Sequence, residues 1–192
     1  MSLRTLIWII IAIIGVSVIS CNARMQFNSA KKKPERQYIE EANITITAPA
    51  LEKKTVNETQ IKETQKDTVE YAAVYGTFYK KTEYSVIYTL YKNEIDIDDA
   101  AQNVINLFAD KSFKHNIYED KEGIDEKVNI DGVFEINGKS FGAKIALIKR
   151  NLNFWQIVAV YPHSDDNIQT AENYINSVII DDVIEHKAEK KQ

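Results

Sequence analysis

The chain has 192 residues, with 28 acidic and 24 basic side chains and a formal net charge of −4 at pH 7. A mildly acidic chain does not attract nucleic acid, so we predict no nucleic-acid partner. The length allows one domain of ordinary size with flanking segments. The only cysteine, Cys21, excludes a disulfide within the chain.

The first 21 residues have the layout of an export signal. One basic residue, Arg4, precedes an apolar run from Leu6 to Ile19, and the small residue Ser20 precedes Cys21. The run is shorter than the roughly 20 apolar residues that a membrane span needs. We therefore interpret residues 1–20 as a signal peptide and not as a transmembrane helix.

The end of this segment, Val18-Ile19-Ser20-Cys21, resembles the lipobox of bacterial lipoproteins. The resemblance implies that Cys21 becomes the new N-terminus and carries a diacylglyceryl group and an amide-linked acyl chain such as palmitate. Two or three acyl chains hold a protein stably on a membrane without spanning it. Asn22 stands where an aspartate retains some lipoproteins at the inner membrane. The expected location is therefore the outer membrane, facing the periplasm or the cell surface.

Residues 21–66 differ in composition from the rest of the chain. They are rich in Lys, Glu, Thr, Asn and Gln and poor in aromatic residues. Such a segment buries too little apolar surface to offset the entropy cost of ordering it, so we predict a flexible tether. Within it, Ile39 to Pro49 alternates like a strand, which leaves open that this part docks on the domain.

Residues 67–184 have the pattern of one α+β domain. Alternating apolar and aromatic residues predict a hairpin from Tyr71 to Tyr91, with a polar turn at Lys80 to Glu83. Capping acids followed by helical periodicity predict a helix from Asp96 to Asp110. We expect residues 113–127 to be a loop, and the acidic group from Glu119 to Glu126 within it lacks the spacing of a calcium-binding loop.

Three strands follow at 128–136, 141–148 and 154–161, and Asn137-Gly138 is a strong hairpin signal between the first two. One face of this meander is strongly apolar, so helices must cover it. We expect the other face to be covered by a further element or to bind a partner. The apolar residues that we assign to this possible partner surface are Val133, Ala146, Ile148, Val158 and Val160.

The C-terminal part predicts a second helix from Ser164 to Val178 and a short strand at 178–183, followed by a charged tail at 185–192. The expected fold class is therefore α+β. Its core would be an antiparallel sheet of about five to six strands with two main helices.

The order of these elements resembles the PsbP-like or Mog-like fold. The resemblance depends on the turn at Asn137-Gly138 and Gly142, the strand from Trp155 to Tyr161, and the helix end Tyr174-Ile175-Asn176-Ser177-Val178. It covers residues 68–182. It implies a binding or assembly factor and not an enzyme, although a shared fold does not transfer a function.

No pattern in the sequence commits to catalysis. His115, His163 and His186 fall in a loop, a turn and the tail, without metal-ligand spacing, and no nucleophile elbow or phosphate-binding glycine loop is present. The sequence therefore predicts no catalytic residue, no metal site and no cofactor.

Our leading hypothesis is a membrane-anchored protein-binding or assembly module of the cell envelope, which includes an immunity or inhibitor role. The mixed sheet face or the loop 113–127 would engage an envelope protein. The alternative is a small-molecule-binding lipoprotein with a pocket lined by Tyr75, Tyr88 and Trp155. A structural envelope factor and an enzyme are the remaining possibilities.

Overall fold

The computed structural model describes residues 33–53, 68–108, 113–121 and 125–181. Cys21, the signal peptide and the charged tail lie outside these ranges, so the predictions made for them stay predictions. Within the described ranges, no helix has the length and the apolar character needed to cross a membrane.

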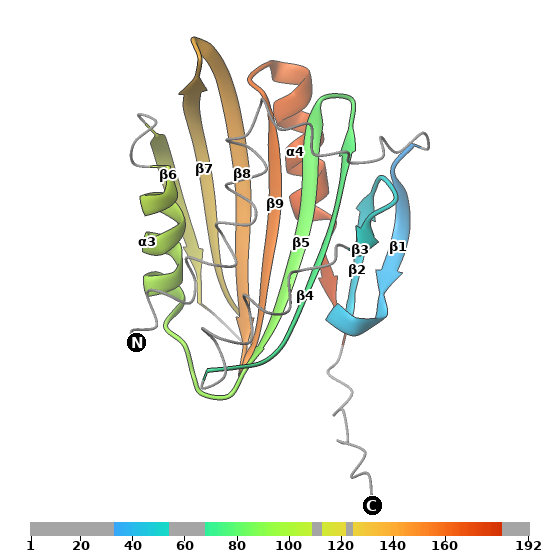
Figure 1. The fold of residues 1–192 in the computed structure, drawn as a ribbon, viewed down its shortest axis with the longest axis vertical. Coiled ribbons are helices and arrows are strands. Elements are labelled where there is room, and N and C mark those ends of the chain that lie inside the picture. The colour runs from blue at the N-terminus through green and yellow to red at the C-terminus, as the bar shows by residue number, and fades with distance from the viewer. Residues whose placement is uncertain (1–32, 54–67, 109–112, 122–124, 182–192) are drawn as a thin grey trace, which may run out of the picture.

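A seven-stranded antiparallel sheet forms the centre of the molecule (Figure 1). In spatial order its strands are β3 (Glu52–Lys53), β4 (Val69–Tyr79), β5 (Thr82–Tyr91), β9 (Asn153–Pro162), β8 (Lys139–Arg150), β7 (Glu126–Ile136) and β6 (Lys114–Asp120). Neighbouring strands are mostly neighbours in sequence, and the long connection from β5 to β9 contains the first helix and the meander. Strands β3 and β6 lie at the two edges of the sheet.

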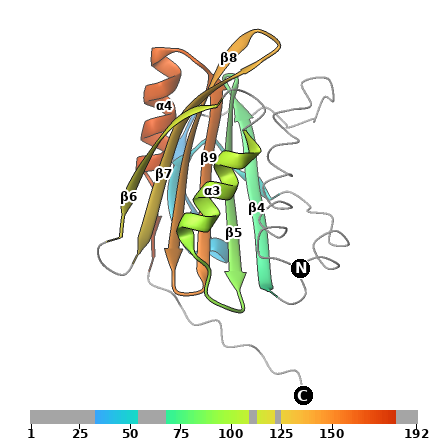
Figure 2. The same cartoon turned by 90° about the vertical axis from the view of Figure 1, so that its left-hand side faces the viewer.

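Helices cover both faces of this sheet (Figure 2). Helix α3 (Ile97–Leu107) lies on one face, and α4 (Asp165–Asn176) lies on the other. A second sheet of three strands shares the α4 face, in the order β1 (Glu35–Ile39), β2 (Ile44–Ala48) and β10 (Ile179–Ile180). The α+β class is thus confirmed, but the predicted five to six strands become seven strands with three more in a second sheet.

The core beneath α3 is aliphatic and aromatic. Asp96 caps the helix by accepting hydrogen bonds from the backbone N–H groups of Asp98 and Asp99. The buried side of α3 then packs with Val128 and Ile130 and with other apolar side chains of the sheet. Burial of this apolar stripe stabilises the helix more than its intrinsic propensity does.

The core on the opposite face joins the central sheet to α4 and the small sheet. Ile44 and Ile46 of β2 are fully buried there, together with Trp155 and Ile157 of β9. The Tyr174 hydroxyl donates to the carbonyl oxygen of Ser85 at 2.9 Å, so the polar end of this buried ring is satisfied.

The predicted tether is wrong for part of its length, because Glu35 to Lys53 contains β1, β2, β3 and the short 3-10 helix η1 (Glu40–Ala42). The alternation between Ile39 and Pro49 was the informative signal. Its buried residues pack on the central sheet, and this burial offsets the entropy cost of ordering a polar segment. The remainder of residues 21–66 lies outside the described ranges.

The hairpin turns determine which residues are buried. Asn137 and Gly138 both have positive φ, of 50° and 72°, which confirms the predicted two-residue turn. The turn between β4 and β5 also contains two residues, Lys80 and Lys81. The predicted turn from Lys80 to Glu83 is therefore too long, since Glu83 lies within β5 and is 8% exposed.

Candidate functional site: the β6 edge

The predicted partner surface does not exist as one exposed face. Val158 pairs with Ile145 and Val160 with Ala143, so both valines point toward α3. Ala146 and Ile148 belong to the opposite core, and all four residues are buried. Val133 is half-buried on that second face. The physical reason is strand register, because the turn after Arg150 sets which residues of β9 share a face with those of β8.

The predicted pocket residues point into the interface between the central sheet and the small sheet. Trp155 donates its indole N–H to the Ala42 carbonyl at 2.6 Å. Tyr88 donates its hydroxyl to Asn153 Oδ1 at 2.7 Å. Tyr75 donates to Glu41 Oε2 at 2.5 Å. The polar group of each predicted pocket residue is thus hydrogen-bonded within the chain.

Glu41 is the centre of a polar cluster that joins η1 to the central sheet. Its carboxylate accepts hydrogen bonds from Lys53 at 2.9 Å, from Tyr75, and from Tyr71 at 2.7 Å. These three bonds, with that of Lys53 having the largest effect, lower the pKa of Glu41 from 4.5 to about 2. Burial and the Glu41 carboxylate raise the pKa of Tyr75. The hydrogen bonds of Glu41 therefore join η1, which lies beside the small sheet, to β3 and β4 of the central sheet.

The predicted loop at 113–127 contains strand β6, which the sequence analysis missed. Lys114 to Asp120 pairs with β7 in unbroken register, with Ile117 opposite Ile130. The acidic residues that follow Tyr118 are typical of a loop in composition. In the structure, hydrogen bonding to β7 makes Lys114 to Asp120 a strand. The signal that could have found β6 is the short β-favouring pair Ile117-Tyr118 beside a long strand.

Strand β6 has an open outer edge. All seven of its residues are exposed, and its only neighbour among the described strands is β7. Ile117 is 43% and Tyr118 is 55% exposed. Because successive side chains alternate, Ile117 lies on the α3 face and Tyr118 on the α4 face. The edge thus offers a row of backbone hydrogen-bonding groups flanked by an apolar or aromatic side chain on each face.

Anchors at both ends hold β6 in place. Before the strand, the Phe113 ring lies over Gly132, where a Cβ atom would overlap it. The same ring stacks on Phe108 at a centroid distance of 4.7 Å. After the strand, Lys121 donates to the Asp98 carboxylate of α3 at 2.7 Å. Aromatic packing thus holds the start of the strand, pairing with β7 holds its length, and an exposed ion pair lies at its end.

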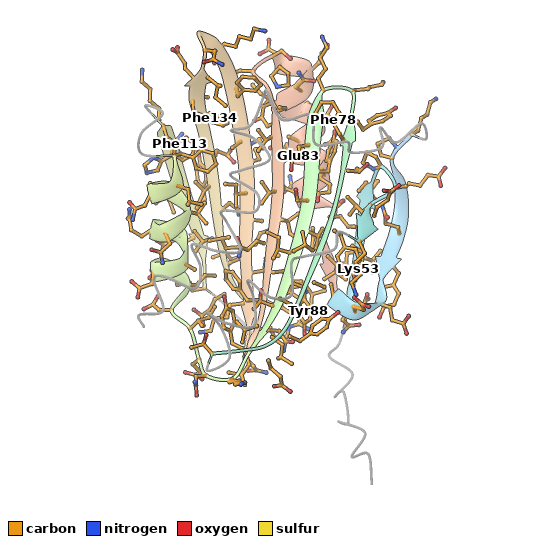
Figure 3. All side chains as sticks on the ribbon, viewed as in Figure 1. Lys53, Phe78, Glu83, Tyr88, Phe113 and Phe134 are labelled. Atoms are coloured by element: carbon orange, nitrogen blue, oxygen red, sulfur yellow. The ribbon has the colours of Figure 1, made fainter. Side chains whose placement is uncertain are left out.

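The other described sheet edges are shorter than β6. Strands β3 and β10 each have two residues, and β1 has five and follows Pro34. Short edge strands and a nearby proline are devices that discourage pairing with another chain. Figure 3 shows that Phe113, beside β6, and Lys53, on β3, lie on opposite sides of the molecule. We define residues 114–120 with their outward-facing backbone as the β6 edge.

The histidines do not meet at a common site. His115 is exposed on β6 and stacks on Phe113 at a centroid distance of 5.2 Å, and His163 is exposed between β9 and α4. His186 lies outside the described residues. Within the described ranges no three His, Cys, Asp or Glu side chains are grouped so as to hold a metal ion.

Among the described residues, the buried hydroxyl groups of Ser85, Thr89 and Tyr91 on β5 find no hydrogen-bond partner. They lie at alternate positions on the α3 face and are at most 2% exposed. Burial raises the pKa of Tyr91. An unpaired buried hydroxyl costs free energy, so this row weakens the sheet in comparison with an apolar row of the same shape.

No protein-family model matches this chain, and no curated protein matches it. LpqN, involved in cell envelope biogenesis of Mycobacterium tuberculosis, is similar in structure at a TM-score of 0.45, with 14% identity over 79% of this chain and 85% of LpqN. The protein of unknown function PA94 from Pseudomonas aeruginosa has a TM-score of 0.41, with 10% identity over 76% of this chain and 92% of its own. Likenesses of this degree carry no argument about function, and the resemblance to the PsbP-like or Mog-like fold stays a prediction.

Proposed function

We propose that this chain is a lipid-anchored, non-catalytic module of the bacterial cell envelope that binds another polypeptide. The binding mode is strand addition, in which an extended segment of the partner pairs with the β6 edge. The lipobox-like sequence ending at Cys21 supports the anchor. The single observation that carries the binding mode is a seven-residue edge strand with every residue exposed.

Strand addition fits the chemistry of this edge. Backbone N–H and C=O groups on the outer side of an edge strand provide affinity for an extended peptide, and the flanking side chains provide specificity. Ile117 and Tyr118 supply one apolar contact on each face of the sheet. Because β6 is already paired with β7 and Phe113 packs at its start, the strand is preorganised for a partner.

Site-specific photocrosslinking in the living host tests this binding mode. A photoreactive amino acid replaces Ile117 in one variant and the exposed α4 residue Gln169 in a control variant. We expect a discrete protein adduct from position 117, and its crosslinked peptide identified by mass spectrometry. An equal adduct from position 169, or none from position 117, would contradict the proposal.

The anchor has its own test. We expect the full chain recovered from membranes to carry an acyl mass on an N-terminal Cys21, and the Cys21→Ser variant to lose both that mass and the membrane association. An unacylated wild-type chain that still begins at Met1 would refute the anchor while leaving the binding mode untouched.

A further inference from the structure

We propose that the polypeptide that pairs with the β6 edge is β6 of a second copy of this chain. This inference rests on the proposed function, because it names the partner of the same edge. Two central sheets would join across a twofold axis through the Ile117 positions. The product is one continuous antiparallel sheet with a copy of the domain on each side.

The sequence of β6, Lys-His-Asn-Ile-Tyr-Glu-Asp, is complementary to itself when read in the opposite direction. Antiparallel pairing centred on Ile117 places Lys114 opposite Asp120 of the second copy and His115 opposite Glu119. Each of these pairs occurs twice, because the axis repeats it. Opposite charges directly across a ladder, as in the two Lys114–Asp120 pairs, stabilise it by roughly 0.2–1 kcal/mol a pair, and like charges destabilise it.

The faces of the sheet agree with this register. Within one chain, His115 of β6 lies opposite Gly132 of β7, and Glu119 lies opposite Val128. Both side chains therefore lie on the α3 face of the sheet. Lys114 and Asp120 both lie on the α4 face. A twofold axis perpendicular to the sheet keeps each face on its own side. The complementary side chains therefore meet on the same face.

Other registers lose this complementarity. A shift of the centre to Asn116 leaves Glu119 and Asp120 beyond the paired strand. A shift to Tyr118 places Ile117 opposite Glu119 and leaves Lys114 beyond the strand. Only the register centred on Ile117 pairs all seven residues and sets Lys114 opposite Asp120 and His115 opposite Glu119.

A paired edge of seven residues is small in comparison with the surface that a stable dimer in solution buries. Anchored chains share one membrane surface, however, and confinement raises their effective concentration. We therefore expect the dimer in the membrane and at high concentration, and dissociation in dilute detergent solution.

Disulfide trapping in the host envelope tests the register. Directly opposite Cα atoms in an antiparallel pair are about 4.5 or 5.5 Å apart, and a disulfide accepts both distances. In the full chain, we expect Ile117→Cys to give a disulfide-linked dimer on non-reducing gels. Tyr118→Cys is the matched control, since Tyr118 is more exposed but lies opposite Asn116. Equal trapping of both variants would contradict the register.

A charge exchange tests the same contacts without a cysteine. We expect Lys114→Asp and Asp120→Lys, each alone, to weaken self-association about tenfold or more, because two attractive pairs become repulsive. Differently tagged copies of the two variants produced in one cell should capture each other, since the mixed dimer restores opposite charges at both pairs. Mixed capture no stronger than self-capture would overturn the proposal, and strong mixed capture shows at the same time that both variants fold.

The outcomes separate the two proposals. If position 117 crosslinks to a different protein while Ile117→Cys gives no homodimer, the second copy is excluded and strand addition stands. If position 117 gives neither product, strand addition at β6 fails together with the dimer.

Discussion

The two edges of the central sheet differ in how the chain treats exposed backbone. At the β3 edge, two residues pair with β4, and the polar cluster around Glu41 joins η1 to the sheet. At the β6 edge, a strand of seven residues directs the N–H and C=O groups of every second residue outward, with no strand beyond them in the described structure. Edge strands of this kind template pairing with other chains, so proteins that do not use them shorten or shield them. This difference between the two edges supports the proposal that a partner strand pairs with the β6 edge.

The largest expected difference in the free energy of unfolding is between the variants Val158→Asp and Ile117→Asp. Val158 is 5% exposed under α3, so an aspartate there would be buried without a partner and should lower the free energy of unfolding by about 5 kcal/mol. Ile117→Asp should change it by less than about 0.5 kcal/mol because the site is exposed. Urea unfolding measures both, and a mild effect at Val158 would contradict the assigned register.

Trp155→Ala should come next, with a loss of about 4 kcal/mol in the free energy of unfolding. The indole is 1% exposed, and its N–H group bonds to Ala42, so removal leaves both a cavity and an unpaired carbonyl between the two sheets. Tyr118→Ala is the control on the open side of the molecule. Comparable losses at both positions would mean that the β6 side is as tightly packed as the η1 side.

Glu41→Gln should produce a smaller, pH-dependent effect. The pKa of Glu41 falls from 4.5 to about 2 on folding, so its contribution to stability is present above pH 4.5 and is lost as the pH falls toward 2. The carboxylate side chain is 44% exposed, and solvent screening keeps the gain below about 1 kcal/mol. Unfolding free energies at pH 7 and at low pH should differ more in the wild type than in the variant. If the free energy of unfolding changed equally with pH in the wild type and in the variant, the hydrogen bonds assigned to Glu41 would be contradicted.

Thr89→Val should have the smallest effect, between neutral and slightly stabilising. Thr89 is fully buried, its hydroxyl has no hydrogen-bond partner in the described part of the chain, and valine has nearly the same shape. Replacing an unpaired buried hydroxyl by a methyl group removes a desolvation cost. Thermal unfolding measures the change, and a loss above about 1 kcal/mol would show that the hydroxyl has a partner, such as a bound ligand or water.

The sequence was sufficient for the elements whose local signals are strong. The Asn137-Gly138 hairpin, the capped helix after Asp96 and the second helix after Ser164 lie where composition and periodicity predict them. Turn chemistry and capping act over a few residues, so a single sequence contains them. The α+β class follows from these elements.

Long-range pairing accounts for what the sequence did not reveal. Whether Val158 shares a face with Ile145 or with Ala146 depends on the length of the turn between β8 and β9, because one residue of slip moves every side chain to the other face. Strand β6 is charged like a loop and becomes a strand only beside β7. The candidate site was therefore predicted as a segment, within residues 113–127, but not as an edge.

Hydrogen exchange at the β6 backbone is the most direct measurement of the central claim. The full chain in host membranes would be compared with the same chain diluted in detergent, with Gln169 and its helix as an internal reference. We predict that the outward-facing amides among residues 114–120 exchange more slowly in the membrane, because they become hydrogen-bonded to a partner strand, while the amides of α4 are unchanged. Equal exchange at β6 in both conditions would contradict strand addition at this edge.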